Sequence, residues 1–216
     1  MTINESELSS LSAKLKSNIN TFVTDANLAI NNYVAQVNTI WCSGESVKAH
    51  GSLSQILKEF DKKIEERAFT NEHGINASIG TNVKNFNTSE LGNHVWNKIQ
   101  FSEPNVNKIS TEVKREFKKG VDGVMPGNSP DDLKRPFKDI TNCYIKLCKN
   151  FISTVSSSNA FDEKQKSAFI AGISGVSNEI TKATEQIDSI ISEGFKKETN
   201  RHKELENVTT SNFGKM

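Results

Sequence analysis

The first forty residues carry apolar side chains at a regular helical spacing. These positions step by three or four residues, which a strand cannot produce. They are Leu8, Leu11, Leu15, Ile19, Phe22, Ala26, Ile30, Tyr33, Val37 and Trp41. The pattern repeats about every eleven residues, which is typical of a nearly straight helix. It predicts a helix over residues 5–40.

A short turn follows this helix. Residues 41–44 read Trp-Cys-Ser-Gly, in which Gly44 can adopt a positive φ. Either Ser43 or Ser46 can cap a following helix through its hydroxyl group. Such a turn between two helical patterns predicts a helical hairpin with Trp41 at its tip.

The second arm of this hairpin is predicted over residues 45–87. Its apolar positions keep the helical spacing and are Val47, Leu53, Leu57, Phe60, Ile64, Ala68, Ile75, Ile79, Val83 and Phe86. Gly74 and Gly80 interrupt the pattern, and a glycine costs about 1 kcal/mol relative to alanine inside a helix. We therefore expect a kink in this second helix.

The segment over residues 89–130 is predicted to be irregular. Weak alternation around Trp96, Ile99 and Phe101 fits a short extended stretch, and residues 106–117 have the spacing of one short helix. Because the side chains of Trp96, Ile99 and Phe101 fall outside the main helices, they are the candidate contact with another protein. The alternative is that this segment folds back and closes the helical core.

Residues 131–216 repeat the hairpin plan. Apolar spacing predicts a third helix over 131–156 and a fourth over 162–207, the latter about 70 Å long at 1.5 Å per residue. The expected fold class is all-α, an elongated bundle of antiparallel helical hairpins. Its expected parts are a hairpin over residues 1–88, the irregular segment and a second hairpin.

Composition narrows the classes of function. The 216 residues include 27 basic and 26 acidic side chains and a net charge of +1, which does not favour nucleic acid as the main ligand. No apolar stretch is long enough to span a membrane, and the start lacks the features of a Sec signal peptide. We expect neither a membrane span nor classical Sec export.

Side chains that catalyse reactions or bind metals form no recognisable motif. The four histidines lack His-x-x-x-His or Glu-x-x-His spacing, and three cysteines are too few and too far apart for a zinc site. Phosphate-binding loops, dinucleotide fingerprints and nucleophile elbows are also missing. The sequence predicts no catalytic residue, no cofactor and no metal, and a protein that is not an enzyme.

The order of helix, Trp41-x-x-Gly44 turn and helix over residues 5–87 resembles the WxG (ESAT-type) helical hairpins of type VII secretion. The turn here is one residue longer than the family's Trp-x-Gly. By this resemblance the Trp41 ring would close the end of the helix pair, and Gly44 would permit the chain reversal. The resemblance implies a non-enzymatic protein that acts through protein contacts, as a homo- or hetero-oligomer, and is exported without a Sec signal.

A second interpretation is a structural subunit of a larger assembly, such as a virion or phage particle. Long amphipathic helices and an irregular middle segment suit contacts with neighbouring subunits. Both interpretations make other protein chains the partners. The location stays open between non-Sec secretion, a virion and the cytoplasm.

Overall fold

The computed structural model describes residues 5–86, 96–118 and 120–213. It is 77% helical, and the strands of its described part are two short ones that form a single sheet. The predicted all-α class is confirmed. Among the helices described, none combines the length and apolar character that crossing a bilayer requires.

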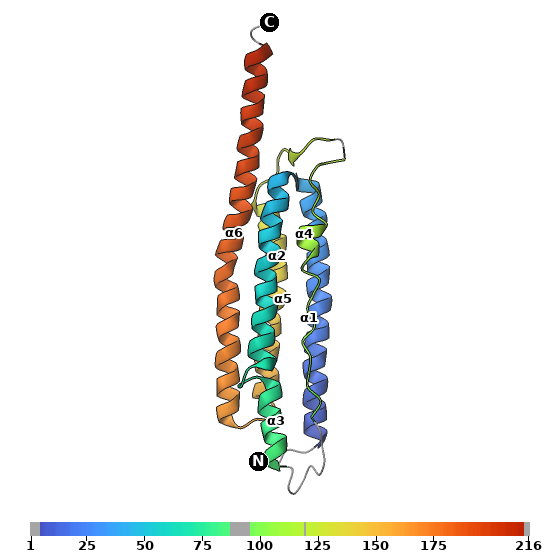
Figure 1. The fold of residues 1–216 in the computed structure, drawn as a ribbon, viewed down its shortest axis with the longest axis vertical. Coiled ribbons are helices and arrows are strands. Elements are labelled where there is room, and N and C mark those ends of the chain that lie inside the picture. The colour runs from blue at the N-terminus through green and yellow to red at the C-terminus, as the bar shows by residue number, and fades with distance from the viewer. Residues whose placement is uncertain (1–4, 87–95, 119, 214–216) are drawn as a thin grey trace. The chain divides into compact units, whose positions relative to one another are not determined.

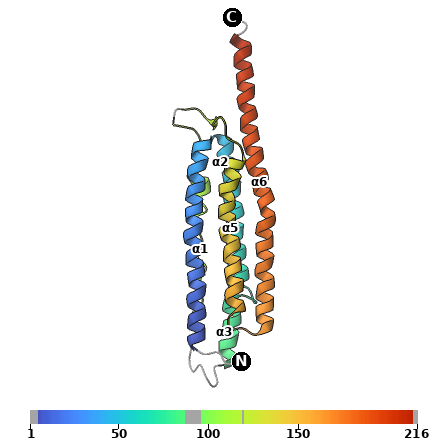
Figure 2. The ribbon, with the colours of Figure 1, turned by 180° about the vertical axis from the view of Figure 1, so that it is seen from behind.

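The chain forms two compact units. Unit 1 comprises Met1–Ala26, Lys58–Pro104 and Thr141–Lys182, and unit 2 comprises Asn27–Leu57, Asn105–Ile140 and Ala183–Met216. Within each unit, segments of four helices lie side by side (Figure 1, Figure 2). These helices are α1 (Glu5–Ile40), α2 (Gly44–Glu65), α5 (Asp131–Ser156) and α6 (Glu163–Phe213). The units thus cut across the predicted parts 1–88, 89–130 and 131–216.

Aromatic rings form the centre of unit 1. Tyr144 of α5 is buried and meets the ring of Phe22 edge-on at 4.8 Å and that of Phe60 at 5.6 Å. Phe69 meets Phe151 in the same way at 5.4 Å. Phe22 and Phe60 lie in the predicted apolar stripes, whereas Phe69 of η1 is not among the predicted positions. Burial of these rings joins α1, α2 and α5.

Unit 2 has a comparable centre around Tyr33 of α1. Its ring meets Phe137 of α5 edge-on at 5.0 Å and lies 5.6 Å from the imidazole of His50. Trp41 packs on Phe195 of α6 with ring centres 5.7 Å apart. All four helices therefore contribute to this core.

The turn between α1 and α2 differs from the prediction in one respect. Ser43 caps α2, since its Oγ accepts a hydrogen bond from the Ser46 backbone N–H at 3.1 Å, as predicted. The prediction of a positive φ at Gly44 is wrong, because the described glycines with positive φ are Gly120, Gly123 and Gly127. Gly44 instead begins α2.

A small sheet joins the turn after α1 to a segment far along the chain. Strand β1 (Trp41–Cys42) pairs antiparallel with β2 (Gly123–Val124), with Trp41 opposite Val124. The two strands are far apart in sequence and only two residues long, so no sequence pattern predicts their pairing. An extended backbone at residues 41–42 followed by the Ser43 cap replaces the glycine turn.

The predicted single helix over residues 45–87 is broken, and not only kinked, before Gly74. α2 passes into the π-helix η1 (Glu66–Thr70), and α3 (Ile75–Phe86) begins after a tight turn. Gly74 is required in this turn, because a Cβ there would lie 2.8 Å from the carbonyl carbon of Phe69. Gly80 lies within α3 without breaking it. The predicted helix end at residue 87 lies outside the described residues.

The middle segment contains less helix than predicted. Residues 96–107 have no helix or strand, and α4 (Lys108–Thr111) is a single turn inside the predicted range 106–117. Asn38 of α1 explains this early end. Its amide donates to the Glu112 carbonyl at 2.8 Å, and its Oδ1 accepts from the Lys114 N–H at 2.7 Å. These bonds hold the backbone in a non-helical path.

The last two helices follow the predicted ranges closely. α5 matches residues 131–156, whereas α6 continues beyond the predicted end at residue 207. A capping box starts α6: Asp162 Oδ1 accepts from the Gln165 N–H at 2.7 Å, and Gln165 Oε1 accepts from the Asp162 N–H at 3.0 Å.

Candidate functional site

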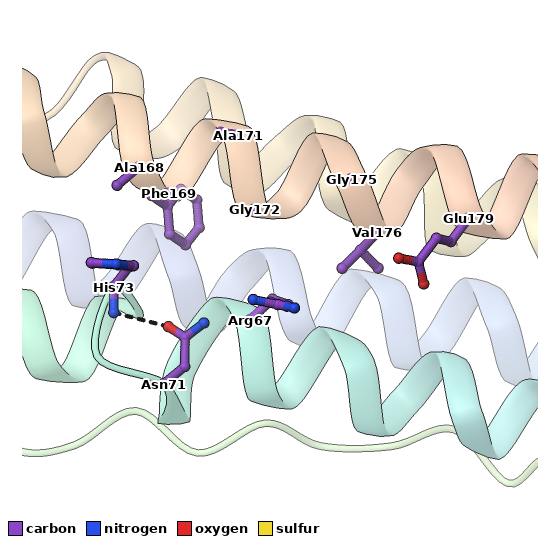
Figure 3. A pocket seen from close by; sticks show the side chains of 10 residues that line it. All are labelled: Arg67, Asn71, His73, Ala168, Phe169, Ala171, Gly172, Gly175, Val176 and Glu179. Carbon is purple, nitrogen blue, oxygen red and sulfur yellow. Dashed lines mark hydrogen bonds between the residues drawn. The ribbon is translucent and has the colours of Figure 1, made fainter.

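A hollow of about 400 Å³ opens in unit 1 between η1 and α6 (Figure 3). We name it the η1–α6 groove. Its walls combine charged, polar and small apolar side chains. The lining residues are Arg67, Asn71, His73, Ala168, Phe169, Ala171, Gly172, Gly175, Val176 and Glu179.

The floor of the groove is open because α6 lacks side chains there. Phe169 and Val176 are buried, while Gly172 and Gly175 have no described atom within 4 Å of an added Cβ. Two glycines inside a helix cost about 1 kcal/mol each relative to alanine. No contact within the described structure requires a glycine at either position. A side chain of a bound partner that enters this space would require it.

The rim of the groove carries the exposed side chain of Arg67. This side chain points into the hollow (Figure 3). In the described part of the chain it makes no close ion pair, but its charge acts on the Glu179 carboxylate across the groove. Across the groove, the Glu179 carboxylate is held by Lys63 of α2 at 2.5 Å. The hydrogen bond from Lys63 is the main cause that lowers the pKa of Glu179, and the charge of Arg67 adds to it, so this carboxylate stays charged.

The turn after η1 fixes the end of the groove. Asn71 Oδ1 accepts a hydrogen bond from the His73 backbone N–H at 3.0 Å (Figure 3). This Asx turn orders the backbone between η1 and α3. The wall of the groove that carries Arg67 and Asn71 is therefore fixed by a hydrogen bond within its own turn.

A second hollow, of about 440 Å³, lies in unit 2 beside the start of α2. Arg201 occupies it with two acids, at 2.6 Å from Glu198 and 2.9 Å from Asp122. Lys48 pairs with Glu45 at 2.8 Å. Most of the charges of this hollow are thus paired with one another, whereas Arg115, which also lines it, is exposed.

Two buried polar pairs lie outside both hollows. Asp61 accepts a hydrogen bond from the Tyr144 hydroxyl at 2.9 Å in unit 1, and Tyr33 is 2.9 Å from His50 Nε2 in unit 2. All four side chains are at most 1% exposed, so no substrate can reach them as they stand. No three His, Cys, Asp or Glu side chains in the described ranges come together as a metal site would require.

The predicted turn residues lie at the end of the hairpin. Trp41 is fully buried and packs against the His50 ring and against the α6 residues Gly194 and Phe195. Its indole N–H finds no acceptor among the described residues. Trp41 is thus a packing residue that joins α6 to the hairpin.

The candidate contact residues lie against unit 1. Asn76 of α3 brackets Ile99, accepting from its N–H and donating to its C=O, each at 2.9 Å. Ile99 is buried, and the Phe101 ring stacks between Phe22 at 6.0 Å and Phe69 at 6.2 Å. Trp96 is half-buried, with its N–H 3.5 Å from Asn76 Oδ1. This geometry favours the alternative in which the segment closes the core.

Sequence reasoning missed the groove residues. The signal that could have indicated them is the pair Gly172 and Gly175 within a strong helical pattern. Arg67 had no such signal, because an exposed arginine on a helix is ordinary. Comparison with models of protein families, with curated proteins and with solved structures finds no match to this chain.

Proposed function

We propose that the chain is a non-enzymatic interaction protein that binds a helix of another protein in the η1–α6 groove. The observation that carries this proposal is the exposed Arg67 guanidinium, which makes no close ion pair in the described structure and lies beside Gly172 and Gly175, with Glu179 acting on it only from across the groove. A positive charge next to an open apolar floor suits a partner with matching chemistry.

The occupant that fits is an amphipathic helix with a large apolar side chain and a nearby carboxylate. The apolar side chain would enter the hollow over Phe169 and Val176, and the carboxylate would pair with Arg67. Small residues at the contact allow the two helix backbones to approach closely. Partial enclosure by the groove would make this ion pair stronger than an exposed one.

A site-specific crosslinker tests this proposal. A photoreactive residue replacing Gly175 should crosslink the partner, whereas one replacing Thr181, which is exposed on another face of the same helix, should not. Binding of the identified partner should fall about tenfold or more with Arg67→Glu, since a pairing charge becomes a repelling one. Lys62→Glu, an exposed charge reversal on α2, is the matched control and should leave affinity near the wild-type value.

The decisive step is a charge swap. A partner whose contacting acid is changed to Arg should recover binding to the Arg67→Glu variant. Equal affinity of wild type and Arg67→Glu, or crosslinks that form equally from both α6 positions, would refute the groove as the binding site.

We further propose that this interaction protein belongs with the WxG-type hairpins. The Trp41-x-x-Gly44 turn and the burial of Trp41 at the hairpin end support it, although Gly44 does not supply a positive φ. Export of an epitope-tagged chain from a host with an intact type VII machine, and its loss when the machine is deleted, is the expected result. The alternative is a structural subunit of a larger assembly. Light scattering measures the mass in solution and distinguishes the two, because a structural subunit would form a ring or filament, whereas a WxG-type protein would be a monomer or dimer.

A further inference from the structure

We infer that the two units respond to pH in opposite directions: the buried Asp61 carboxyl weakens unit 1 as the pH rises, and the buried His50 imidazole weakens unit 2 as the pH falls. This inference concerns groups outside the η1–α6 groove and does not depend on it. It rests on how each buried group is surrounded.

Asp61 lies in an environment that disfavours its charged form. It is 1% exposed, and its Oδ1 receives one hydrogen bond, from the Tyr144 hydroxyl of α5. Its Oδ2 has no hydrogen-bond partner among the described residues. An ionised carboxylate that is buried with a single donor is costly, so the neutral acid is favoured.

The titratable groups that face this pair strengthen the effect. Glu103, in the segment before α4, acts on Asp61 with a charge of the same sign, and Cys143 of α5 acts on Tyr144. Burial, the first cause, and Glu103 raise the pKa of Asp61 to about 8, against the opposing hydrogen bond from Tyr144. The folded unit therefore holds a proton that the unfolded chain releases near its ordinary pKa of about 3.9.

His50 lies in the opposite situation. It is fully buried, its Nδ1 lies 2.6 Å from the Ser46 carbonyl oxygen, and its Nε2 lies 2.9 Å from the Tyr33 hydroxyl. A carbonyl only accepts, so Nδ1 carries the hydrogen and Nε2 accepts from Tyr33. The neutral imidazole satisfies both contacts.

Protonation of His50 would remove its hydrogen bond from Tyr33 and leave a buried charge. Tyr33 of α1, Trp41 of β1 and Ser46 of α2 face the ring, and none of them carries a charge. Behind these residues, Phe137 of α5 packs on Tyr33 and Phe195 of α6 packs on Trp41, and neither ring carries a charge. Burial, opposed by the Ser46 hydrogen bond, lowers the pKa of His50 to about 4.

The directions follow from proton linkage. Unit 1 binds more protons folded than unfolded between about pH 4 and pH 8, so it loses stability as the pH rises through that range. Unit 2 binds fewer protons folded than unfolded between about pH 4 and pH 6.5, so it loses stability as the pH falls through that range.

The two tryptophans allow each unit to be followed in the intact chain. Trp96 lies in unit 1 and Trp41 in unit 2. With 5-fluorotryptophan at both positions, ¹⁹F NMR during urea unfolding reports a midpoint at each tryptophan. The Trp96 midpoint should fall as the pH rises from about 4 to 8, and the Trp41 midpoint should fall as the pH drops from about 6.5 to 4.

Variants assign each trend to its group. Asp61→Asn should abolish the Trp96 trend and leave the Trp41 trend, and His50→Gln should do the reverse. Glu59→Gln and His73→Gln, which change exposed side chains, are matched controls that should leave both trends. Midpoints that move in the same direction with pH, or an Asp61→Asn variant that keeps the Trp96 trend, would overturn the inference.

A direct titration covers the case in which a variant does not fold. In the wild-type chain, ¹³C NMR should give a titration midpoint above the ordinary aspartate value for the Asp61 carboxyl. The midpoint of the His50 imidazole should lie below the ordinary histidine value. Ordinary midpoints for either group would overturn the inference for its unit.

Discussion

The ring of Trp41 lies directly on the backbone of Gly194 in α6. A Cβ at Gly194 would sit 2.5 Å from Cη2 of the indole and 3.4 Å from the Cβ of Ala49. The glycine that Trp41 needs is therefore not Gly44 in its own turn but one far along the chain. This contact, together with the Phe195 ring, fastens α6 to the end of the α1–α2 hairpin.

The first prediction compares these two glycines. Gly194→Ala should lower the free energy of unfolding by about 1 to 3 kcal/mol, because its methyl group overlaps a buried ring that cannot move freely. Gly44→Ala should be neutral or slightly stabilising, since the added methyl meets no described atom within 4 Å and φ is not positive. Urea denaturation measures both. A larger loss from Gly44→Ala would contradict the packing at the turn.

The second prediction concerns Trp41 itself. Trp41→Ala should cost about 3 to 5 kcal/mol, because the side chain is fully buried. Trp41→Phe should cost clearly less, since the indole N–H has no acceptor in the described structure and its removal loses no hydrogen bond. Denaturant melts of the two variants provide the comparison. Equal losses would mean that the N–H has a partner.

The third prediction tests the β1–β2 sheet. Gly123 has a φ of +143°, and an added Cβ would lie 1.8 Å from Nε2 of His202. Gly123→Ala should therefore separate β2 from α6 and destabilise the sheet. Gly127→Ala is the matched control, because Gly127 also has a positive φ but open space around its Cα.

Hydrogen exchange gives the readout for this pair. The Met125 N–H, which donates to the Ile40 carbonyl at 2.9 Å, should exchange faster in Gly123→Ala than in Gly127→Ala. Adding His202→Ala to Gly123→Ala should restore part of the protection. Similar exchange in the two glycine variants would show that backbone strain, and not His202, dominates.

The fourth prediction decides the role of the segment around Ile99. Asn76→Ala removes both hydrogen bonds to the Ile99 backbone and should cost about 1 to 3 kcal/mol. The Ile99 amide should also lose protection from hydrogen exchange. Asn97→Ala, an exposed asparagine nearby, is the control. If Trp96→Ser with Phe101→Ser leaves the melt unchanged, these side chains are contact residues and do not close the core.

The fifth prediction gives the size of the Asp61 effect. Asp61→Asn should stabilise the protein by about 2 to 4 kcal/mol at pH 7, where the native state holds a proton that the unfolded chain releases. The gain should shrink toward zero near pH 4, at which both states of the wild type are protonated. Chemical denaturation at the two pH values measures this difference. A constant gain would point to packing instead of ionisation.

Much of the helical architecture follows from the sequence alone. The spacing of apolar residues placed α1 and α5 at their observed bounds, because a helix needs only a local pattern and a buried stripe. A serine cap at Ser43 or Ser46 and a disturbance of the second helix near Gly74 were predictable for the same reason, although the helix breaks there and does not merely bend. Each depends on residues only a few positions apart.

Long-range contacts decided the rest. No local pattern encodes the pairing of β1 with β2 or the packing of Trp41 on Gly194, because each joins residues distant in the chain. The same holds for the hydrogen bonds with Asn38 of α1 that end α4 early. The η1–α6 groove likewise needs Arg67 and Gly172 to meet. Burial of Asp61 and His50 is also a tertiary outcome, since a carboxyl or imidazole looks the same in sequence whether water or aromatic rings surround it.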